Sequence, residues 1–140
     1  MSILREEYPW SNCRNDRLIL LINCSKSKRP YKGRADEVYS GPLVQLGLQY
    51  ATKTKMTPLI LSTKYGIIRP SKIIEPYDEK FKVPYDGPWP HLPGYWIGSQ
   101  EYFLRVPSYF QRFFPKSWSY GQQKGWLMDF LNDKPHEKLR

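Results

Sequence analysis

The chain has 140 residues, of which 22 are Lys or Arg and 13 are Asp or Glu, so its formal net charge is +9. This length predicts a single α/β domain over residues 1–140, because it allows one real core but not two. No stretch approaches the roughly 20 apolar residues of a membrane span, and the N-terminus lacks a secretory apolar region. We therefore expect a cytoplasmic protein with no membrane partner. Two cysteines and two histidines lack metal-ligand spacing, so we expect no metal or other cofactor.

The basic charge and the aromatic content together predict a nucleic-acid partner. Lys and Arg attract phosphates regardless of sequence, and exposed aromatic rings give faces on which unstacked bases can lie. Aromatic residues make up 16% of the chain. DNA or RNA is therefore the expected partner. The alternative is that the basic residues serve solubility alone.

The first half of the chain has the pattern of a β-α-β unit. After an irregular arm over residues 1–16, the apolar run at 18–23 predicts a strand that is covered on both faces. Residues 56–61 predict a second such strand. Between them, Pro42 in a first helical turn predicts a crossover helix over residues 42–53. The expected fold is α/β, a three-layer α/β/α sandwich with a mainly parallel sheet.

The second half is less regular. Short apolar pairs stopped by Pro70 and Pro76 predict extended, loop-like pieces, because proline keeps its predecessor out of the helical region. Residues 84–94, rich in proline and glycine, predict an ordered loop at the rim of a pocket or a surface excursion without a role. From Ser99 onward, aromatic residues at three-and-four spacing predict helix, interrupted at Pro107. A helix over residues 122–131 and a frayed tail over 132–140 follow. The stripe of Phe110, Phe113 and Phe114 is expected in the core.

Each of the two predicted strands ends in a short polar turn that holds a serine and a lysine. The first turn covers residues 24–28 and the second covers residues 62–66. Open α/β sheets bind ligands beyond the carboxyl ends of their parallel strands. The two turns therefore predict one shared pocket, suited to an anion or a polar heterocycle.

Three residues are candidates for catalysis. Cys24 follows the first strand directly, and Lys26 and Lys28 would favour its thiolate if they point toward it, although it can equally be a small buried side chain. Lys28 would hold phosphate or polarise a base. Asp78 is the candidate general base or water-orienting carboxylate, and it can equally cap a turn. The candidate substrate-binding residues are Ser25, Tyr39, Ser62, Lys64, Tyr65, Gly66 and Tyr77.

An ordered set of motifs over about residues 18–80 resembles a known group of proteins. The motifs are Ile22-Asn23-Cys24-Ser25-x-x-Lys28, Tyr39-Ser40-Gly41, Leu61-Ser62-Thr63-Lys64-Tyr65-Gly66-Ile67-Ile68-x-Pro70 and Ile74-x-Pro76-Tyr77-Asp78. They resemble an uncharacterised bacterial and phage family, which is itself similar to the YaaA peroxide-stress proteins and to the uracil-DNA-glycosylase-like domain of archaeosine synthase. Cys24, Ser25 and Lys28 match the archaeosine synthase signature.

The resemblance implies a uracil-DNA-glycosylase-like α/β/α sandwich and an association with DNA or modified tRNA bases. We therefore expect a nucleic-acid-directed protein that acts on or recognises a base, as a base-modifying transferase or an N-glycosidase-like enzyme. Two alternatives stay open. One is a non-catalytic DNA- or RNA-binding protein. The other is a nucleotide-binding accessory protein, for example of a phage.

Overall fold

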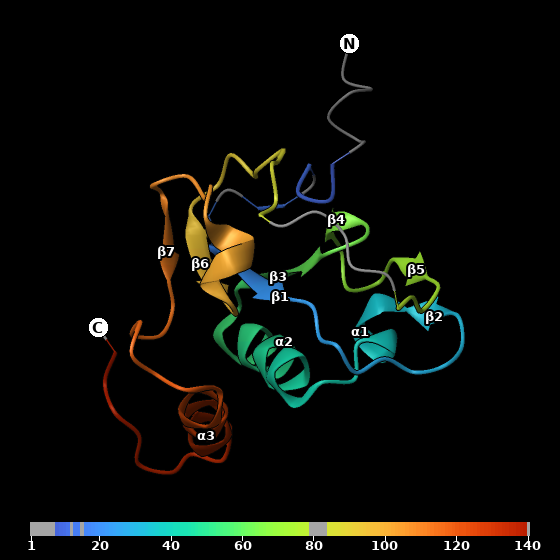
Figure 1. Ribbon diagram of the computed structural model, residues 1–140. Helices are drawn as coiled ribbons and strands as arrows, with labels where there is room; N and C mark the ends of the chain where they lie inside the picture. The colour runs from blue at the N-terminus through green and yellow to red at the C-terminus, as the bar shows by residue number, and fades with distance from the viewer. Residues whose placement is uncertain (1–7, 12, 15, 79–83, 140) are drawn as a thin grey trace.

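A computed structural model describes residues 8–11, 13–14, 16–78 and 84–139 of the chain. Its centre is a five-stranded sheet in the order β4-β3-β1-β6-β7, and a separate two-stranded sheet pairs β2 with β5 (Figure 1). The strands are β1 (Ile19–Asn23), β2 (Gly33–Arg34), β3 (Thr57–Ser62), β4 (Gly66–Ile68), β5 (Ile73–Ile74), β6 (Gly94–Ile97) and β7 (Phe110–Arg112). The helices are α1 (Ala35–Val38), α2 (Pro42–Thr54), α3 (Tyr120–Leu131) and the 3-10 helix η2 (Gln100–Phe103).

The sheet is mainly parallel, as the sequence predicted. Strand β1 lies at its centre and pairs in parallel with β3 on one side and with β6 on the other. Strand β7 continues this parallel arrangement beyond β6, and only β4 is antiparallel, to β3. The first four residues of β1 have no more than a trace of exposed surface, which explains their continuous apolar run. Four parallel strands therefore bring their carboxyl ends to one edge.

The two long helices, α2 and α3, cover the same face of the sheet (Figure 1). Helix α2 begins at Pro42. Proline lacks a backbone N–H, but at the first helical position this group has no partner within the helix in any case. Helix α3 begins with a capping box between Ser119 and Gln122. An aromatic cluster joins the helices to the sheet; it consists of Tyr50, Phe113, Phe114, Trp126 and Phe130. The predicted helices at 42–53 and 122–131 are confirmed.

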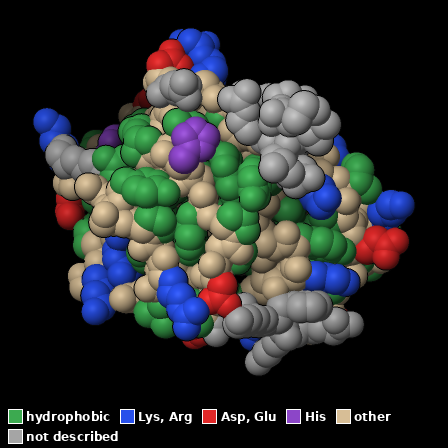
Figure 2. All heavy atoms as spheres, turned by 90° about the horizontal axis from the view of Figure 1, so that it is seen from above, with side chains coloured by type: hydrophobic (Ala, Val, Ile, Leu, Met, Phe, Trp, Pro, Cys, Tyr) green, Lys and Arg blue, Asp and Glu red, His purple; other side chains and the backbone are tan. Residues whose placement is uncertain are grey.

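The opposite face of the sheet is covered by irregular segments and a 3-10 turn. Trp10, Leu92, Phe103 and Phe110 pack there against the side chains that β1 and β3 point to this side. Figure 1 shows the yellow segment before β6 on this side. Seen from this side, hydrophobic side chains fill the middle of the surface and Lys and Arg side chains lie around its rim (Figure 2). Among the described residues, no α-helix covers this face.

Residues 84–93 form neither helix nor strand, as the sequence predicted, and β6 begins at the end of this loop. The helix predicted from Ser99 onward is wrong, because η2 and β7 lie there instead. Phe110 points into the core from a three-residue strand, and Pro107 prevents a helix from running through this region. Gly94 allows β6 to approach β1, because a Cβ at this position would lie 2.1 Å from the carbonyl oxygen of Ile19. The prediction that Phe110, Phe113 and Phe114 are core residues is confirmed.

The end of the chain packs against α3 rather than fraying from it. The indole nitrogen of Trp126 donates a hydrogen bond of 2.7 Å to the carbonyl oxygen of Glu137. The ring of His136 lies against Trp126 and Phe130. Of the arm over residues 1–16, part lies outside the described residues; Trp10 in the described part is buried. Within the described ranges, no helix is long and apolar enough to cross a membrane.

Candidate functional site at the carboxyl edge of the sheet

The two predicted Ser/Lys turns lie side by side at the carboxyl edge of the sheet. Asn23 at the end of β1 is in register with Leu61 of the parallel strand β3. Just beyond these positions, the thiol of Cys24 lies 3.9 Å from the hydroxyl oxygen of Thr63. Parallel pairing brings the two turns together because both strands run toward the same edge. The expected juxtaposition of residues 24–28 and 62–66 is therefore confirmed.

A network of four hydroxyl groups, from Tyr39, Ser62, Thr63 and Tyr77, holds this edge together. The Tyr39 hydroxyl donates to Ser62 Oγ at 2.7 Å and lies 2.8 Å from the Tyr77 hydroxyl. The Tyr77 hydroxyl also lies 3.1 Å from Ser62 Oγ and 3.1 Å from Thr63 Oγ1. Burial raises the pKa of Tyr39 well above its usual range. These four groups, of which Thr63 is only partly buried, bond one another and support the turns.

The network changes the role expected of Tyr39 and Ser62. Their exposed fractions are 0% and 2%, so neither side chain presents a surface to a ligand. Ser62 Oγ also accepts hydrogen bonds from the backbone N–H groups of Lys64 and Tyr65, which fixes the second turn. Gly66 has φ +74°, the left-handed conformation expected of a glycine there. The ring of Tyr85, rather than a ligand, approaches it.

The lysines of the two turns converge on Tyr77. Lys28 Nζ lies 4.4 Å from the centroid of the Tyr77 ring, and Lys64 Nζ lies 5.7 Å from the same centroid. Lys28 Nζ also donates to the carbonyl oxygen of Lys26, at 3.2 Å. Attraction between an ammonium group and an aromatic face holds each lysine close to the ring. Two positive charges thus lie near one another at the surface of the hydroxyl network.

The surroundings of Cys24 suit a pocket wall better than an activated nucleophile. Its sulfur lies 3.9 Å from both the Thr63 and the Tyr77 hydroxyl groups. Among the described residues, no carboxylate or imidazole is bonded to it, and nucleophilic thiols depend on such a base. Asp78 is exposed, and within the described part of the chain no hydrogen bond or ion pair joins it to Cys24, Lys28 or Lys64.

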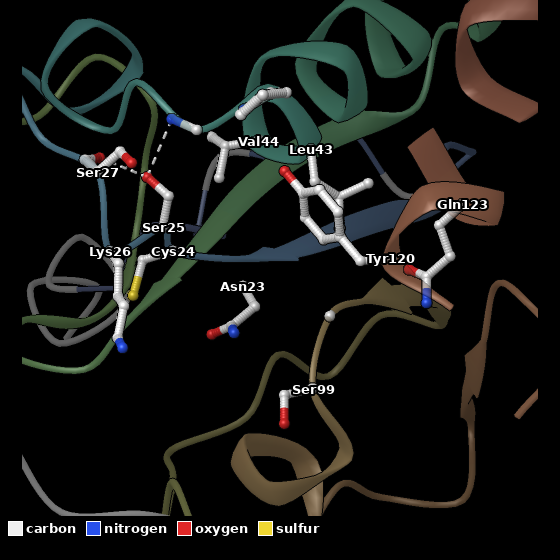
Figure 3. A pocket seen from close by; sticks show the side chains of 13 residues that line it. Asn23, Cys24, Ser25, Lys26, Ser27, Leu43, Val44, Ser99, Tyr120 and Gln123 are labelled. Carbon is white, nitrogen blue, oxygen red and sulfur yellow. Dashed lines mark hydrogen bonds between the residues drawn. The ribbon is translucent and has the colours of Figure 1, made fainter. Parts of the chain in front are cut away.

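Beside the first turn lies a hollow of about 440 Å³, which we call the Asn23 hollow. Figure 3 shows the Asn23 side chain in its middle, between the first turn and Ser99. Asn23 Oδ1 is buried and has no hydrogen-bond partner among the described atoms. Tyr120, whose exposed fraction is 52%, and Gln123 reach the hollow from α3. A buried polar atom without a partner is costly, so the carboxamide of Asn23 is suited to turn and bind a polar ligand in the hollow.

Ser25 shapes the same hollow from the opposite wall. Its hydroxyl donates to the carbonyl oxygen of Ser27 at 2.7 Å and accepts from the backbone N–H of Gly41 at 3.2 Å, as Figure 3 shows. The bond from Gly41 joins the first turn to the residue before α2. Ser25 therefore orients the turn, whereas the sequence predicted that it binds a ligand.

A second hollow, of about 260 Å³, lies beside the second turn and is lined in part by Tyr85 and Tyr102. Burial raises the pKa of Tyr85 to about 12 and also raises the pKa of Tyr102. This hollow is lined by Ser62, Thr63, Lys64 and Gly66 but by no residue of the first turn, and the Asn23 hollow is lined by no residue of the second. Neither hollow is thus the pocket predicted between the turns, where Tyr77 and Thr63 make contact.

Several site residues at this edge were not predicted from the sequence. Asn23 could have been noticed, because it is a polar residue that ends an otherwise apolar strand. Ser99 and Gln123 could not, because their position depends on β6 and on the way α3 packs against the sheet. Within the described ranges, no group of three His, Cys, Asp or Glu side chains is placed to hold a metal ion.

The fold and the site define an α/β protein with a polar, basic edge at the carboxyl ends of its parallel strands. Residues 19–85 match a family described as "Family of unknown function (DUF6884)". The match is just under half of the chain, runs from β1 past β5 and includes both turns, so the chain is similar to this family over that region. No curated protein and no solved structure matches.

Proposed function

We propose that the protein binds a base of DNA or RNA in the Asn23 hollow and recognises or modifies it there. The observation that carries this proposal is Asn23, which lines a hollow beside the basic first turn and whose buried Oδ1 has no partner among the described atoms. Carboxamide groups pair with the hydrogen-bonding edges of bases. The proposal moves the ligand from between the two turns to the side of the first.

The walls of the hollow support a flat, polar ligand. The exposed ring of Tyr120 offers a face for stacking, which stabilises unstacked bases by about 1–3 kcal/mol each. Leu43 and Val44 at the start of α2 add an apolar wall. A volume of about 440 Å³ is in the range of small-molecule sites. A base within a duplex would have to be flipped out to reach it, at a cost of a few kcal/mol.

The lysines of the edge support a nucleic-acid ligand rather than a neutral metabolite. Lys26 lines the hollow itself, and Lys28 and Lys64 lie close by around Tyr77. Together with the net charge of +9, these groups favour a ligand that carries several phosphates. Lys28 and Lys64 would bind the backbone on one side of the base.

The likeness to a uracil-DNA-glycosylase-like sandwich belongs to the same proposal. Its support is the parallel order β3-β1-β6-β7, with α2 and α3 on one face, and the motif resemblance to YaaA and archaeosine synthase over about residues 18–80. In this comparison, η2 and the irregular segments would stand in place of the second helical layer. A fold likeness alone does not define a reaction.

A non-catalytic base-binding protein is the second candidate. It is favoured by the exposure of Asp78 and by the absence, among the described residues, of a base bonded to Cys24. The enzyme hypothesis assigns Cys24 as nucleophile, Lys28 as the group that polarises the base, and Asp78 as the group that orients water or accepts a proton.

Incubation with unmodified DNA and with tRNA that carries modified bases separates the two candidates. Mass spectrometry of the digested nucleic acid would reveal a changed or released base if the protein is an enzyme. Asn23→Ala should weaken binding of a single-stranded oligonucleotide about tenfold, because it removes one hydrogen bond to the base. Asp78→Ala should abolish turnover but leave binding unchanged.

The matched control is Asn132→Ala, an exposed asparagine that follows α3. Equal affinity of Asn23→Ala, Asn132→Ala and the wild type would contradict the proposed base site. Binding without any product, for every base tested, would leave the non-catalytic candidate.

A further inference from the structure

A third hollow, of about 270 Å³, lies where β6 and β7 end, and the proposed function does not use it. We call it the Arg112 hollow. Arg112 and Lys116 line it together with Gln100 and Gln123. Arg112 is the last residue of β7, which runs parallel to β6, so its side chain emerges at the same carboxyl edge as the two turns.

The lining of the Arg112 hollow is positively charged. Among the described residues, neither Arg112 nor Lys116 takes part in an ion pair, and no Asp or Glu lines the hollow. The guanidinium carbon of Arg112 lies 4.6 Å from the centroid of the Trp96 ring, which fixes the position of this side chain. A planar guanidinium held in this way presents its donors in the fork that matches a phosphate group.

The Arg112 hollow shares a wall with the Asn23 hollow. Gly98, Ser99 and Gln123 line both of them. A ligand whose base lies beside Asn23 would therefore extend past Ser99 toward Arg112. The two amide side chains and two cations of the Arg112 hollow suit a phosphate.

We propose that the Arg112 hollow is a phosphate subsite, in which Arg112 and Lys116 bind a phosphate of the nucleotide whose base occupies the Asn23 hollow. This inference rests on the proposed function for the identity of the neighbouring base. It adds a second basic group to the site, on the far side of the Asn23 hollow from Lys28. The phosphate belongs to the backbone of a strand or to a free nucleotide.

The test compares two double variants of equal net charge. Arg112→Gln/Lys116→Gln removes the subsite, and Arg17→Gln/Lys55→Gln removes two charges at the opposite, amino ends of β1 and β3. Fluorescence anisotropy with a labelled single-stranded oligonucleotide, over a range of salt concentrations, measures both affinity and salt dependence. We expect the first variant to bind roughly 10- to 100-fold more weakly and to have a salt slope smaller by about 0.7, the contribution of one neutralised phosphate of a single strand.

One further variant and one further measurement guard against a loss of folding. Arg112→Lys keeps the charge but not the fork, and should bind with an affinity between those of the wild type and the double variant. Thermal unfolding establishes that each variant is folded at the temperature of the binding measurement. Equal affinity and equal salt slope for the two double variants would overturn the subsite, because general charge would then explain all of the binding.

Inorganic pyrophosphate serves as a probe without a base, and the indole N–H resonances of Trp96 and Trp118 report on the Arg112 hollow. We expect saturable shifts in the wild type and none in Arg112→Gln/Lys116→Gln. If pyrophosphate binds there while Asn23→Ala leaves oligonucleotide affinity unchanged, the phosphate site is supported and the base site fails. If Asn23→Ala weakens oligonucleotide binding but pyrophosphate causes no shift, the phosphate subsite fails and the base site stands.

A comparison of a 5′-mononucleotide with its nucleoside identifies the source of the phosphate. Tighter binding of the mononucleotide would indicate a free nucleotide. If Arg112→Gln/Lys116→Gln weakens binding of oligonucleotides only, the phosphate belongs to the backbone of a strand.

Discussion

Ser62 has a structural role at the carboxyl edge of the sheet. It is a buried serine whose oxygen receives three hydrogen bonds, from the Tyr39 hydroxyl and from the backbone of Lys64 and Tyr65. A hydroxyl at the end of a buried strand can thus serve the turn that follows it. The sequence motif around Ser62 is therefore explained in part by structure alone.

Replacing Ser62 by alanine should destabilise the protein by about 1–3 kcal/mol, because two turn N–H groups and a buried tyrosine hydroxyl lose their acceptor. Urea unfolding measures this difference. Ser40→Ala is the control, since Ser40 is exposed and should change stability by no more than about 0.5 kcal/mol. Similar unfolding free energies for the two variants would show that the network does not stabilise the fold.

Gly98 and Gly125 should respond in opposite directions to the same substitution. Gly98 has φ +139°, and a Cβ there would lie 2.3 Å from the Cβ of Asn23. Gly98→Ala should therefore cost about 1–3 kcal/mol and displace Asn23. Gly125 lies within α3, and an added Cβ meets nothing within 4 Å, so Gly125→Ala should stabilise by about 0.5–1 kcal/mol.

Thermal unfolding of both variants, with the amide resonances of Asn23 as a second readout, checks this prediction. A Gly98→Ala protein as stable as the wild type, with Asn23 undisturbed, would contradict the close approach of β6 to β1. The Gly125→Ala variant controls for the general effect of alanine on unfolded-chain entropy.

At the scale of elements, the sequence identified the parts of the sheet that have long, continuous apolar runs. The ends of β1, α2 and β3 were predicted within a residue or two. A strand covered on both faces carries a continuous run of Leu and Ile, and Pro42 indicated the start of the helix between the two strands. β6 and β7 were not, since strands of four and three residues leave too short a pattern to distinguish from helix or loop. Tertiary packing decides such segments.

The same difference explains which site residues were found. Cys24, Ser25 and Lys64 follow predicted strands, and parallel pairing alone brings their turns together. Ser99 follows β6 and Arg112 is the last residue of β7, two strands that the sequence did not predict, so their presence at the same edge could not be foreseen. Half of the carboxyl edge was thus predictable and half depends on the register of β6 and β7.

At the scale of the whole molecule, buried tyrosines should make the fold sensitive to alkali. Burial raises the pKa of Tyr39 above its usual range, raises that of Tyr85 to about 12 and raises that of Tyr102, whereas an unfolded tyrosine titrates near 10. Above about pH 10 the unfolded chain therefore binds fewer protons than the folded chain, and stability must fall as the pH rises. Below that pH the stabilisation is fully present.

Urea unfolding at several pH values between about 9 and 12 measures this slope. Tyr39→Phe should unfold more easily at neutral pH, because it loses a buried hydrogen bond, yet show a shallower decline with alkali. Tyrosinate absorbance of the folded protein should rise in more than one step. A free energy of unfolding that stays constant across this range would refute the prediction.

Both outer strands of the sheet are short: β4 and β7 have three residues each. An unpaired strand edge is a template on which a neighbouring chain can add its own backbone, and its length sets how many such bonds can form. Each outer strand can therefore form only a few such hydrogen bonds, and Arg112 places a positive charge on β7. Concentrated solutions of this protein should therefore resist fibril growth through sheet extension.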